Sequence, residues 1–222
     1  MRHPDPQNIR RARSAIDPAF LGMPVLRSKE LDRLLGLELL VKNETANPLR
    51  CFKGRGASAF VAEAGAAREF VCASAGNFGQ AMAWAARASG TKITVFASTN
   101  AVPQKIEAMR KLGAEVVLEG EDFDSAKEVA RAFAQERDAE FVEDGAHASI
   151  AEGAGTIALE LTEAAKLDAV LVPLGNGALA GGVGAWIKHE MPKARMVAVS
   201  ARGAPSMAES VAAERLIERP AP

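Results

Sequence analysis

One lysine lies among neighbours that suit it for covalent chemistry. The run at residues 51–57 reads CFKGRGA, and it stands where an extended stretch gives way to a helical one. Gly54 and Gly56 carry no side chain, so the sequence predicts that a flat molecule can approach the backbone there. The amine of Lys53, if held away from solvent, could attack a carbonyl carbon. The alternative is an ordinary surface lysine at the start of a helix.

A second candidate is the turn at residues 73–80, which reads ASAGNFGQ and joins a predicted strand to a predicted helix. The backbone N–H groups at the start of that helix, with the hydroxyl of Ser74 and the amide of Asn77, would suit a carboxylate or another anion. The alternative is a simple helix cap by Ser74 or Asn77.

A third candidate is the glycine-rich turn at residues 174–182, which reads LGNGALAGG and follows an apolar strand. Its glycines would let the backbone curl around a phosphate at the start of the next helix. Gly175, Gly177 and Ala180 also match the dinucleotide fingerprint G-x-G-x-x-G/A. No acidic residue follows the next strand to hold a ribose hydroxyl, although Arg202 there would suit a 2′-phosphate. An NADP-dependent oxidoreductase is therefore an alternative.

The elements that must position these turns alternate along the chain. Apolar runs predict strands at 37–41, 69–73, 92–96, 115–118, 140–142, 169–173 and 195–199. Helical periodicity and capping residues predict helices at 28–36, 54–64, 77–89, 103–113, 122–133, 149–165 and 178–190. This order predicts an α/β protein with a mostly parallel sheet, whose ligands bind at the carboxyl ends of the strands.

Composition narrows the class of protein further. The 222 residues carry 27 basic and 28 acidic side chains, for a net charge of -1, so nothing favours nucleic acid or an anionic membrane. The apolar runs are too short to span a bilayer. The two cysteines and three histidines form no metal-ligand spacing, so we expect no metal site, and we expect a cytoplasmic protein.

Taken together, the three turns would suit a small cofactor that has one phosphate and one carbonyl group, and a substrate that has a carboxylate. The sequence resembles the pyridoxal-phosphate enzymes of the tryptophan-synthase β fold (fold-type II), most of all threonine and serine dehydratases. Residues 51–57 resemble the family motif S-F-K-x-R-G-A, residues 74–80 resemble S-x-G-N-H-G-Q, and residues 173–179 resemble P-x-G-G-G-G-L. The stretch from 102 to 117 also follows the family pattern, and the similarity runs from about residue 37 to 207.

The resemblance implies a role for each matching residue. Lys53 would hold pyridoxal 5′-phosphate through a Schiff base and later move the substrate's α-proton. The other cofactor contacts would come from Phe52, Asn77, Gly175, Asn176, Gly177, Ala178 and Leu179. The substrate would be bound by Ser74, Ala75, Gly76, Asn77 and Phe78.

The implied activity is a lyase that removes the β-hydroxyl of an amino acid such as threonine or serine, leaving a 2-oxo acid and ammonia. A β-replacement enzyme or an amino-acid racemase on the same fold is the alternative. Ala75 stands where racemases carry a second acid/base serine, which argues against racemisation. Phe78 replaces the family's histidine and is predicted to alter the substrate pocket. Arg55 is expected to form a structural ion pair.

The resemblance also implies an architecture of two lobes, each with a mostly parallel sheet flanked by helices. Residues 1–70 and 146–222 would form the large cofactor-binding lobe, and residues 71–145 a small mobile lobe. The family continues beyond the point where this chain stops, so we expect the last part of the large lobe to be missing and an inactive truncated product to be possible. A homodimer or higher homo-oligomer is expected.

Overall fold

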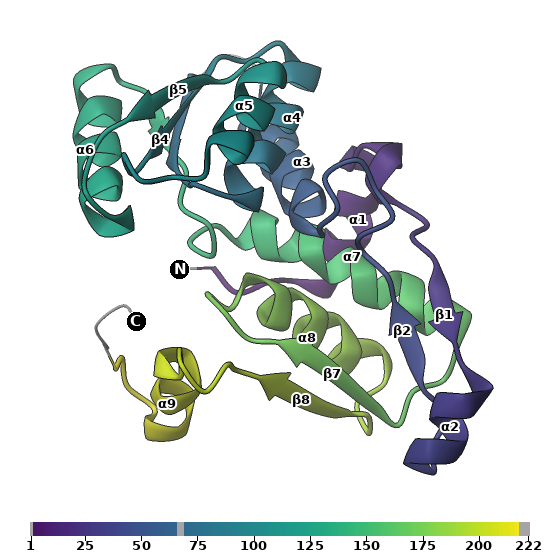
Figure 1. Ribbon diagram of the computed structural model, residues 1–222. Helices are drawn as coiled ribbons and strands as arrows, with labels where there is room; N and C mark the ends of the chain where they lie inside the picture. Colours follow the sequence, from purple (N-terminus) through teal and green to yellow (C-terminus); the bar gives the residue numbers. More distant parts are fainter. Residues whose placement is uncertain (1, 66–68, 218–222) are drawn as a thin grey trace.

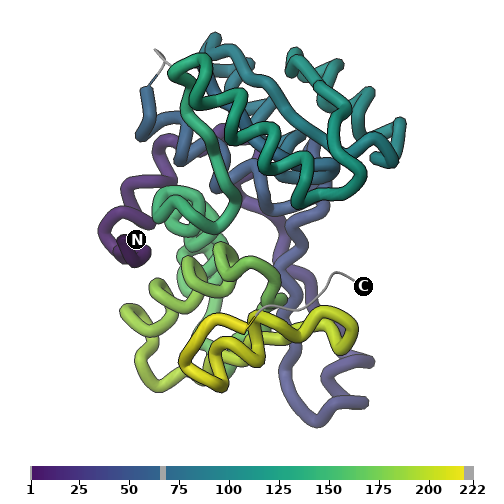
Figure 2. The backbone as a smooth tube through the Cα atoms, turned by 90° about the vertical axis from the view of Figure 1, so that its left-hand side faces the viewer, coloured from purple at the N-terminus to yellow at the C-terminus, as the bar shows by residue number. Residues whose placement is uncertain are grey.

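Strands and helices mostly alternate along the described chain. The computed structural model describes residues 2–65 and 69–217 (Figure 1). In two views at right angles, the segment with β3 to β6 lies at one end of the molecule, and the segment from β7 to α9 lies at the other (Figures 1 and 2). The predicted α/β class, with mostly parallel sheets and flanking helices, is confirmed. The lobe boundaries at residues 71 and 145 remain a prediction.

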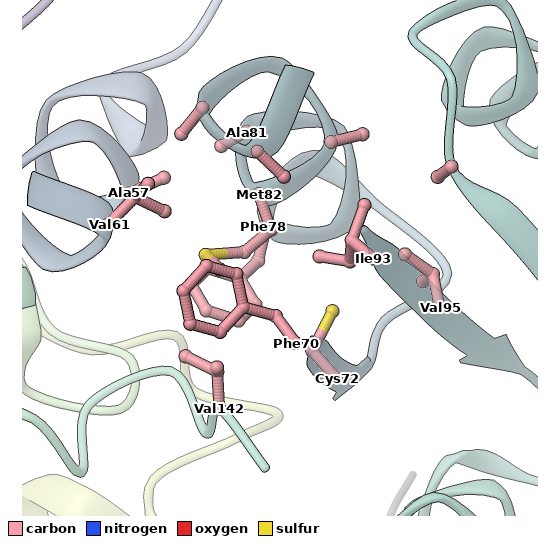
Figure 3. Close-up of a cluster of buried hydrophobic side chains, with 14 of the residues drawn as sticks. Ala57, Val61, Phe70, Cys72, Phe78, Ala81, Met82, Ile93, Val95 and Val142 are labelled. Atoms are coloured by element: carbon pink, nitrogen blue, oxygen red, sulfur yellow. The ribbon is translucent and has the colours of Figure 1, made fainter. Parts of the chain in front are cut away.

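The largest sheet in the described chain has four parallel strands in the order β5-β4-β3-β6. They are β3 (Phe70–Ala73), β4 (Ile93–Ala97), β5 (Glu115–Leu118) and β6 (Glu140–Phe141). The connecting helices are α4 (Asn77–Ser89), α5 (Pro103–Lys111) and α6 (Phe123–Glu136). Side chains alternate across this sheet, so Val71 and Phe96 pack with α6, while the neighbouring strand residues face α4. The core between the sheet and α4 includes Phe70, Cys72, Met82 and Val95 (Figure 3).

Three helices form the centre of the molecule. They are α3 (Lys53–Ala64), α7 (Ala148–Ala164) and α8 (Ala178–Glu190), and α7 runs between the other two (Figure 1). Small residues let these helices approach closely: a Cβ placed on Gly182 would lie 1.9 Å from the carbonyl oxygen of Ala151. The helix α7 is consequently buried along most of its length.

Two short sheets flank these helices. One pairs β7 (Ala169–Pro173) with β8 (Arg195–Val199) in parallel, and the other pairs β1 (Val25–Arg27) with β2 (Leu40–Lys42) in antiparallel fashion. The remaining described helices are α1 (Pro6–Ala15), a 3-10 turn at Pro18–Phe20, α2 (Lys29–Leu35) and α9 (Ser206–Ala213). None of the helices in the described ranges combines the length and apolarity that crossing a membrane requires.

Helix ends follow their local signals closely. Ser28 and Asp122 cap α2 and α6 as predicted, and Gly36 and Gly90 end α2 and α4 in the left-handed conformation. The strand predicted at 37–41 was wrong at its start, because the Leu39 N–H donates 2.7 Å to the side chain of Asp32 and stays in the turn after α2. The sequence did not lead to a prediction of α1, β1 or α9, although Asp5 caps α1 and Pro6 begins it.

Candidate active site

Lys53 is the first residue of α3, and its side chain is only 17% exposed. Its Nζ lies 4.7 Å from the centre of the Phe52 ring and donates to Asp144 Oδ2 over 2.5 Å. The loop before it is tied by Asn47, whose Nδ2 donates to the carbonyl oxygens of Glu44 and Cys51. The amine is therefore held in one place by an aromatic face and a carboxylate.

Gly54 and Gly56, beside Lys53, allow close packing within the protein and not the approach of a ligand, as was predicted. A Cβ on Gly54 would lie 2.5 Å from the ring of Phe20, and a Cβ on Gly56 would lie 2.7 Å from the carbonyl oxygen of Ile150. Both glycines let α3 pack against its neighbours in the protein. The expectation that they leave room for a flat ligand was wrong, because the space is filled by the chain itself.

Arg55 forms the predicted structural ion pair. Its side chain is fully buried and donates to both oxygens of Glu160, at 2.8 and 2.9 Å, and to both oxygens of Glu44, at 2.9 and 2.8 Å. Thr156 accepts a further hydrogen bond at 3.0 Å. These contacts join the first turn of α3 to α7, so they fix the position of Lys53 two residues away.

The two carboxylates around Arg55 titrate differently. Burial raises the pKa of Glu44, and the nearby Arg55 charge offsets this only in part. Burial also acts to raise the pKa of Glu160, but hydrogen bonds from Arg55, Lys42 and the Gly22 N–H outweigh it and lower that pKa to about 2. We therefore expect Glu160 to carry a full charge throughout the neutral range.

The turn at 74–77 follows the carboxyl end of β3 and begins α4. Ser74 Oγ accepts hydrogen bonds from the N–H groups of Gly76 and Gly79, at 3.2 and 3.0 Å. Ser74 thus accepts from an N–H group of the first turn of α4, but the N-cap residue is Gly76 and not Ser74 or Asn77, as the alternative predicted. A Cβ on Gly76 would lie 4.0 Å from Lys105 Nζ, which adds a positive charge near the turn.

Phe78 lies on the inner side of α4. The residue is 6% exposed and packs in the core with Phe70 and Met82 (Figure 3). Any contact that Phe78 makes with a substrate would therefore come from its backbone. Ala75, by contrast, is half-buried beside the core.

The glycine-rich turn follows β7 and begins α8. Gly177 has φ +93° and is the N-cap residue of α8, a conformation that favours glycine. Asn176 Oδ1 accepts a hydrogen bond from the Ala178 N–H at 3.2 Å. Within residues 2–65 and 69–217, the N–H groups of Gly175, Asn176 and Gly177 have no acceptor. A Cβ on Gly175 would meet nothing within 4 Å, so the turn is open to an anion.

The loop between β6 and α7 contacts both Lys53 and the glycine-rich turn. Glu143 pairs with Lys127 and Arg131 of α6, and Asp144 pairs with Lys53. Gly145, at φ +89°, lies against Asn176: a Cβ there would be 3.1 Å from the Asn176 carbonyl oxygen. No role was predicted for Asp144 from the sequence. Its place at the carboxyl end of a predicted strand was the available signal.

No group of three or more His, Cys, Asp or Glu side chains in the described part of the chain is arranged to hold a metal ion. The site consists of the Lys53 amine, the Asp144 carboxylate, the Phe52 ring and two turns that begin helices. Among the described residues, acceptors are lacking for the N–H groups of 175–177 in one turn and for those of Ala75 and Asn77 in the other. Such a set can hold a small anionic molecule next to a reactive amine.

Comparisons with known proteins agree with this chemistry. The family model described as "Pyridoxal-phosphate dependent enzyme" matches residues 16–222. The chain is 35% identical over 201 residues to L-threonine dehydratase biosynthetic IlvA of Escherichia coli (strain K12), and the match covers 89% of this chain and 39% of that protein. The chain thus spans well under half the length of that relative.

Solved structures give the same result. Maize serine racemase superposes with a TM-score of 0.91 at 28% identity, covering 99% of this chain and 68% of that one. The processed form of threonine deaminase isoform 2 from Solanum lycopersicum superposes with a TM-score of 0.87 at 26% identity, covering 97% of this chain and 66% of that one. With the site geometry and the family match, these results show that the chain belongs to the family of pyridoxal-phosphate dependent enzymes.

Proposed function

We propose that the whole protein is an ammonia lyase that converts a β-hydroxy amino acid, such as threonine or serine, to a 2-oxo acid and ammonia. The observation that carries the proposal is the partly buried amine of Lys53, fixed at the start of α3 between Phe52 and Asp144. Relatives named as threonine dehydratase and threonine deaminase support the same reaction class.

The described residues suit pyridoxal phosphate in three respects. Lys53 offers an amine for the aldehyde, Phe52 offers a ring face, and the turn before α8 offers free N–H groups for the phosphate. When bound, the cofactor supplies an electron-withdrawing ring that stabilises negative charge at the substrate's α-carbon. The cofactor contacts we propose are Phe52, Lys53, Asn77, Gly175, Asn176, Gly177, Ala178 and Leu179.

The protein's own groups would carry out the remaining steps. The turn at residues 74–77, near the charge of Lys105, would bind the substrate carboxylate, and the N–H groups of Ala75 and Asn77 are its backbone donors without an acceptor among the described residues. Lys53 would take the α-proton at its Nζ, and departure of the β-hydroxyl as water would leave an enamine that hydrolyses to the 2-oxo acid and ammonia. Substrate-binding residues under this proposal are Ser74, Ala75, Gly76, Asn77 and Phe78.

Racemisation is the second candidate, because maize serine racemase is among the similar structures. The methyl group of Ala75 can neither give nor take a proton, so this turn would supply no second acid or base from that position. We therefore favour the lyase. We also propose a homodimer or higher homo-oligomer in the cytoplasm, where the free and buried Cys51 and Cys72 would stay reduced.

The test compares the wild-type protein with Lys53→Ala after incubation with pyridoxal phosphate. We expect a yellow chromophore in the wild type, trapped on Lys53 by borohydride and located by peptide mass mapping, and none in the variant. Threonine and serine should then release ammonia and a 2-oxo acid from the wild type only. A folded wild-type protein with no adduct on Lys53 would refute the proposal, and release of D-serine without ammonia would favour the racemase.

A further inference from the structure

Asp144 is the only described residue with a buried side-chain oxygen or nitrogen that lacks a hydrogen-bond partner: its Oδ2 accepts from Lys53 Nζ at 2.5 Å, and its Oδ1 has none. A buried carboxylate oxygen without a donor is costly, so its presence calls for an explanation, and a catalytic role is one. Lys53 and Asp144 are 17% and 19% exposed and come from separate elements, the start of α3 and the loop before α7.

The loop around Asp144 keeps this carboxylate from moving away. On one side, Glu143 is tied to Lys127 and Arg131 of α6. On the other side, Gly145 adopts a left-handed conformation and lies against Asn176 of the glycine-rich turn. Burial, with the charge of Asp144 as the smaller cause, raises the pKa of the Cys72 thiol to about 12, so that thiol stays protonated at neutral pH.

We propose that Asp144 is the positioning residue for Lys53, and that it accepts the proton which Nζ must lose before it can attack a carbonyl carbon. The Lys53 ammonium gives one proton to the Asp144 carboxylate, and the neutral amine then adds to the carbonyl carbon. The two hydrogens left on nitrogen depart with the carbonyl oxygen as water, and a carbon–nitrogen double bond forms. The proton can then return from Asp144 to that nitrogen, so atoms and charge balance.

This inference rests on the proposed function only for the identity of the carbonyl compound that Lys53 attacks. The contact between Lys53 and Asp144 itself is observed independently of any cofactor. The test therefore uses formaldehyde with cyanoborohydride, a small carbonyl probe that needs no cofactor pocket, and measures methylation of Lys53 by peptide mass mapping. Failure to bind pyridoxal phosphate would count against the proposed function and would leave this measurement intact.

The variants are Asp144→Ala, which leaves room for formate, and Asp144→Asn, whose amide fills that room. Glu163→Gln is the control, since Glu163 pairs with Arg13 at the surface and lies at the end of α7 farthest from the loop that holds Asp144. We expect methylation of Lys53 to slow at least about tenfold in both Asp144 variants and to stay near the wild-type rate in the control. Added formate should restore the rate in Asp144→Ala and leave Asp144→Asn slow.

Two results would overturn the proposal in variants that circular dichroism shows to be folded. A wild-type or faster rate in both variants would mean that the carboxylate merely stabilises the ammonium. Equal slowing in both variants, with no effect of formate, would mean that Asp144 has only a packing role.

Discussion

Single residues decide how charge is held around the lysine. Arg55 is fully buried and shares its donors between Glu44 and Glu160, and Lys42 adds a second cation to Glu160. A buried ion pair of this kind gives little net stability, but removal of one partner leaves a charge without compensation. The main role of these ion pairs is therefore to fix the start of α3, where Lys53 lies.

The low pKa of Glu160 predicts an acid dependence of stability. The folded-state value of about 2 lies below the ordinary value of 4.5, so the contribution of Glu160 is complete above pH 4.5 and is lost as pH falls towards 2. The difference corresponds to about 3 kcal/mol in the free energy of unfolding. In urea titrations between pH 6 and pH 3, Glu160→Gln should lose less stability than the wild type.

Glu163→Gln is the matched control for that experiment, because Glu163 is on the same helix but pairs with Arg13 at the surface. Its effect should stay below about 1 kcal/mol at any pH. The raised pKa of Glu44 acts in the opposite direction, and Glu160→Gln removes one of its smaller causes, the Glu160 charge, while Glu163→Gln leaves that cause in place. An acid slope in Glu160→Gln as steep as that of the wild type would contradict the assignment.

At the scale of elements, close helix contacts set the position of the two candidate turns. The helix α7 touches α3 through Gly56 and Gly153 and touches α8 through Gly155 and Gly182. Since α3 begins at Lys53 and α8 begins after the glycine-rich turn, these contacts determine how the amine and the anion site face each other.

Gly182→Ala should therefore be strongly destabilising. The new Cβ would lie 1.9 Å from the Ala151 carbonyl oxygen and 2.8 Å from the Gly155 nitrogen, and both are backbone atoms that cannot rotate away. We expect the free energy of unfolding in urea to fall by about 3 kcal/mol or more. Gly184→Ala on the same helix meets only Met196 Cε at 3.9 Å, and it should be neutral or stabilising by up to about 1 kcal/mol. Equal effects would refute the packing argument.

At the scale of the whole molecule, no residue within 2–65 or 69–217 covers the outward face of the β7–β8 sheet. Val170 and Val172 are buried, and Val170 packs with the cluster that holds α8, while Leu171 and Val199 on the outward face are 70% and 53% exposed. Parallel sheets are normally covered on both faces, so this apolar surface is expected to promote association.

Leu171→Thr combined with Val199→Thr should reduce association without loss of stability. Both side chains are already exposed to water, so the free energy of unfolding should change by no more than about 0.5 kcal/mol. Light scattering at increasing concentration should show less self-association than in the wild type. As a control, Val172→Thr puts a hydroxyl in the core and should destabilise the protein by about 1–3 kcal/mol. Unchanged scattering would show that the outward face is not the associating surface.

Local sequence signals were enough to predict the order of most elements and to single out the three turns that we propose for the chemistry. Helix caps such as Ser28 and Asp122 and the apolar runs of the strands act through neighbours a few residues away, so they can be recognised locally. The run around Lys53 and the glycine-rich turn also sit at element boundaries that local signals define.

Tertiary structure alone decided which residues meet. Asp144 lies 91 residues from Lys53 in the chain, and Glu160 lies 105 residues from Arg55. The packing of α3, α4 and α7 likewise decides that the side chain of Phe78 points into the core. The same packing fills the space beside Gly54 and Gly56. No local pattern encodes such pairings, because they arise from side chains that distant helices bring into contact.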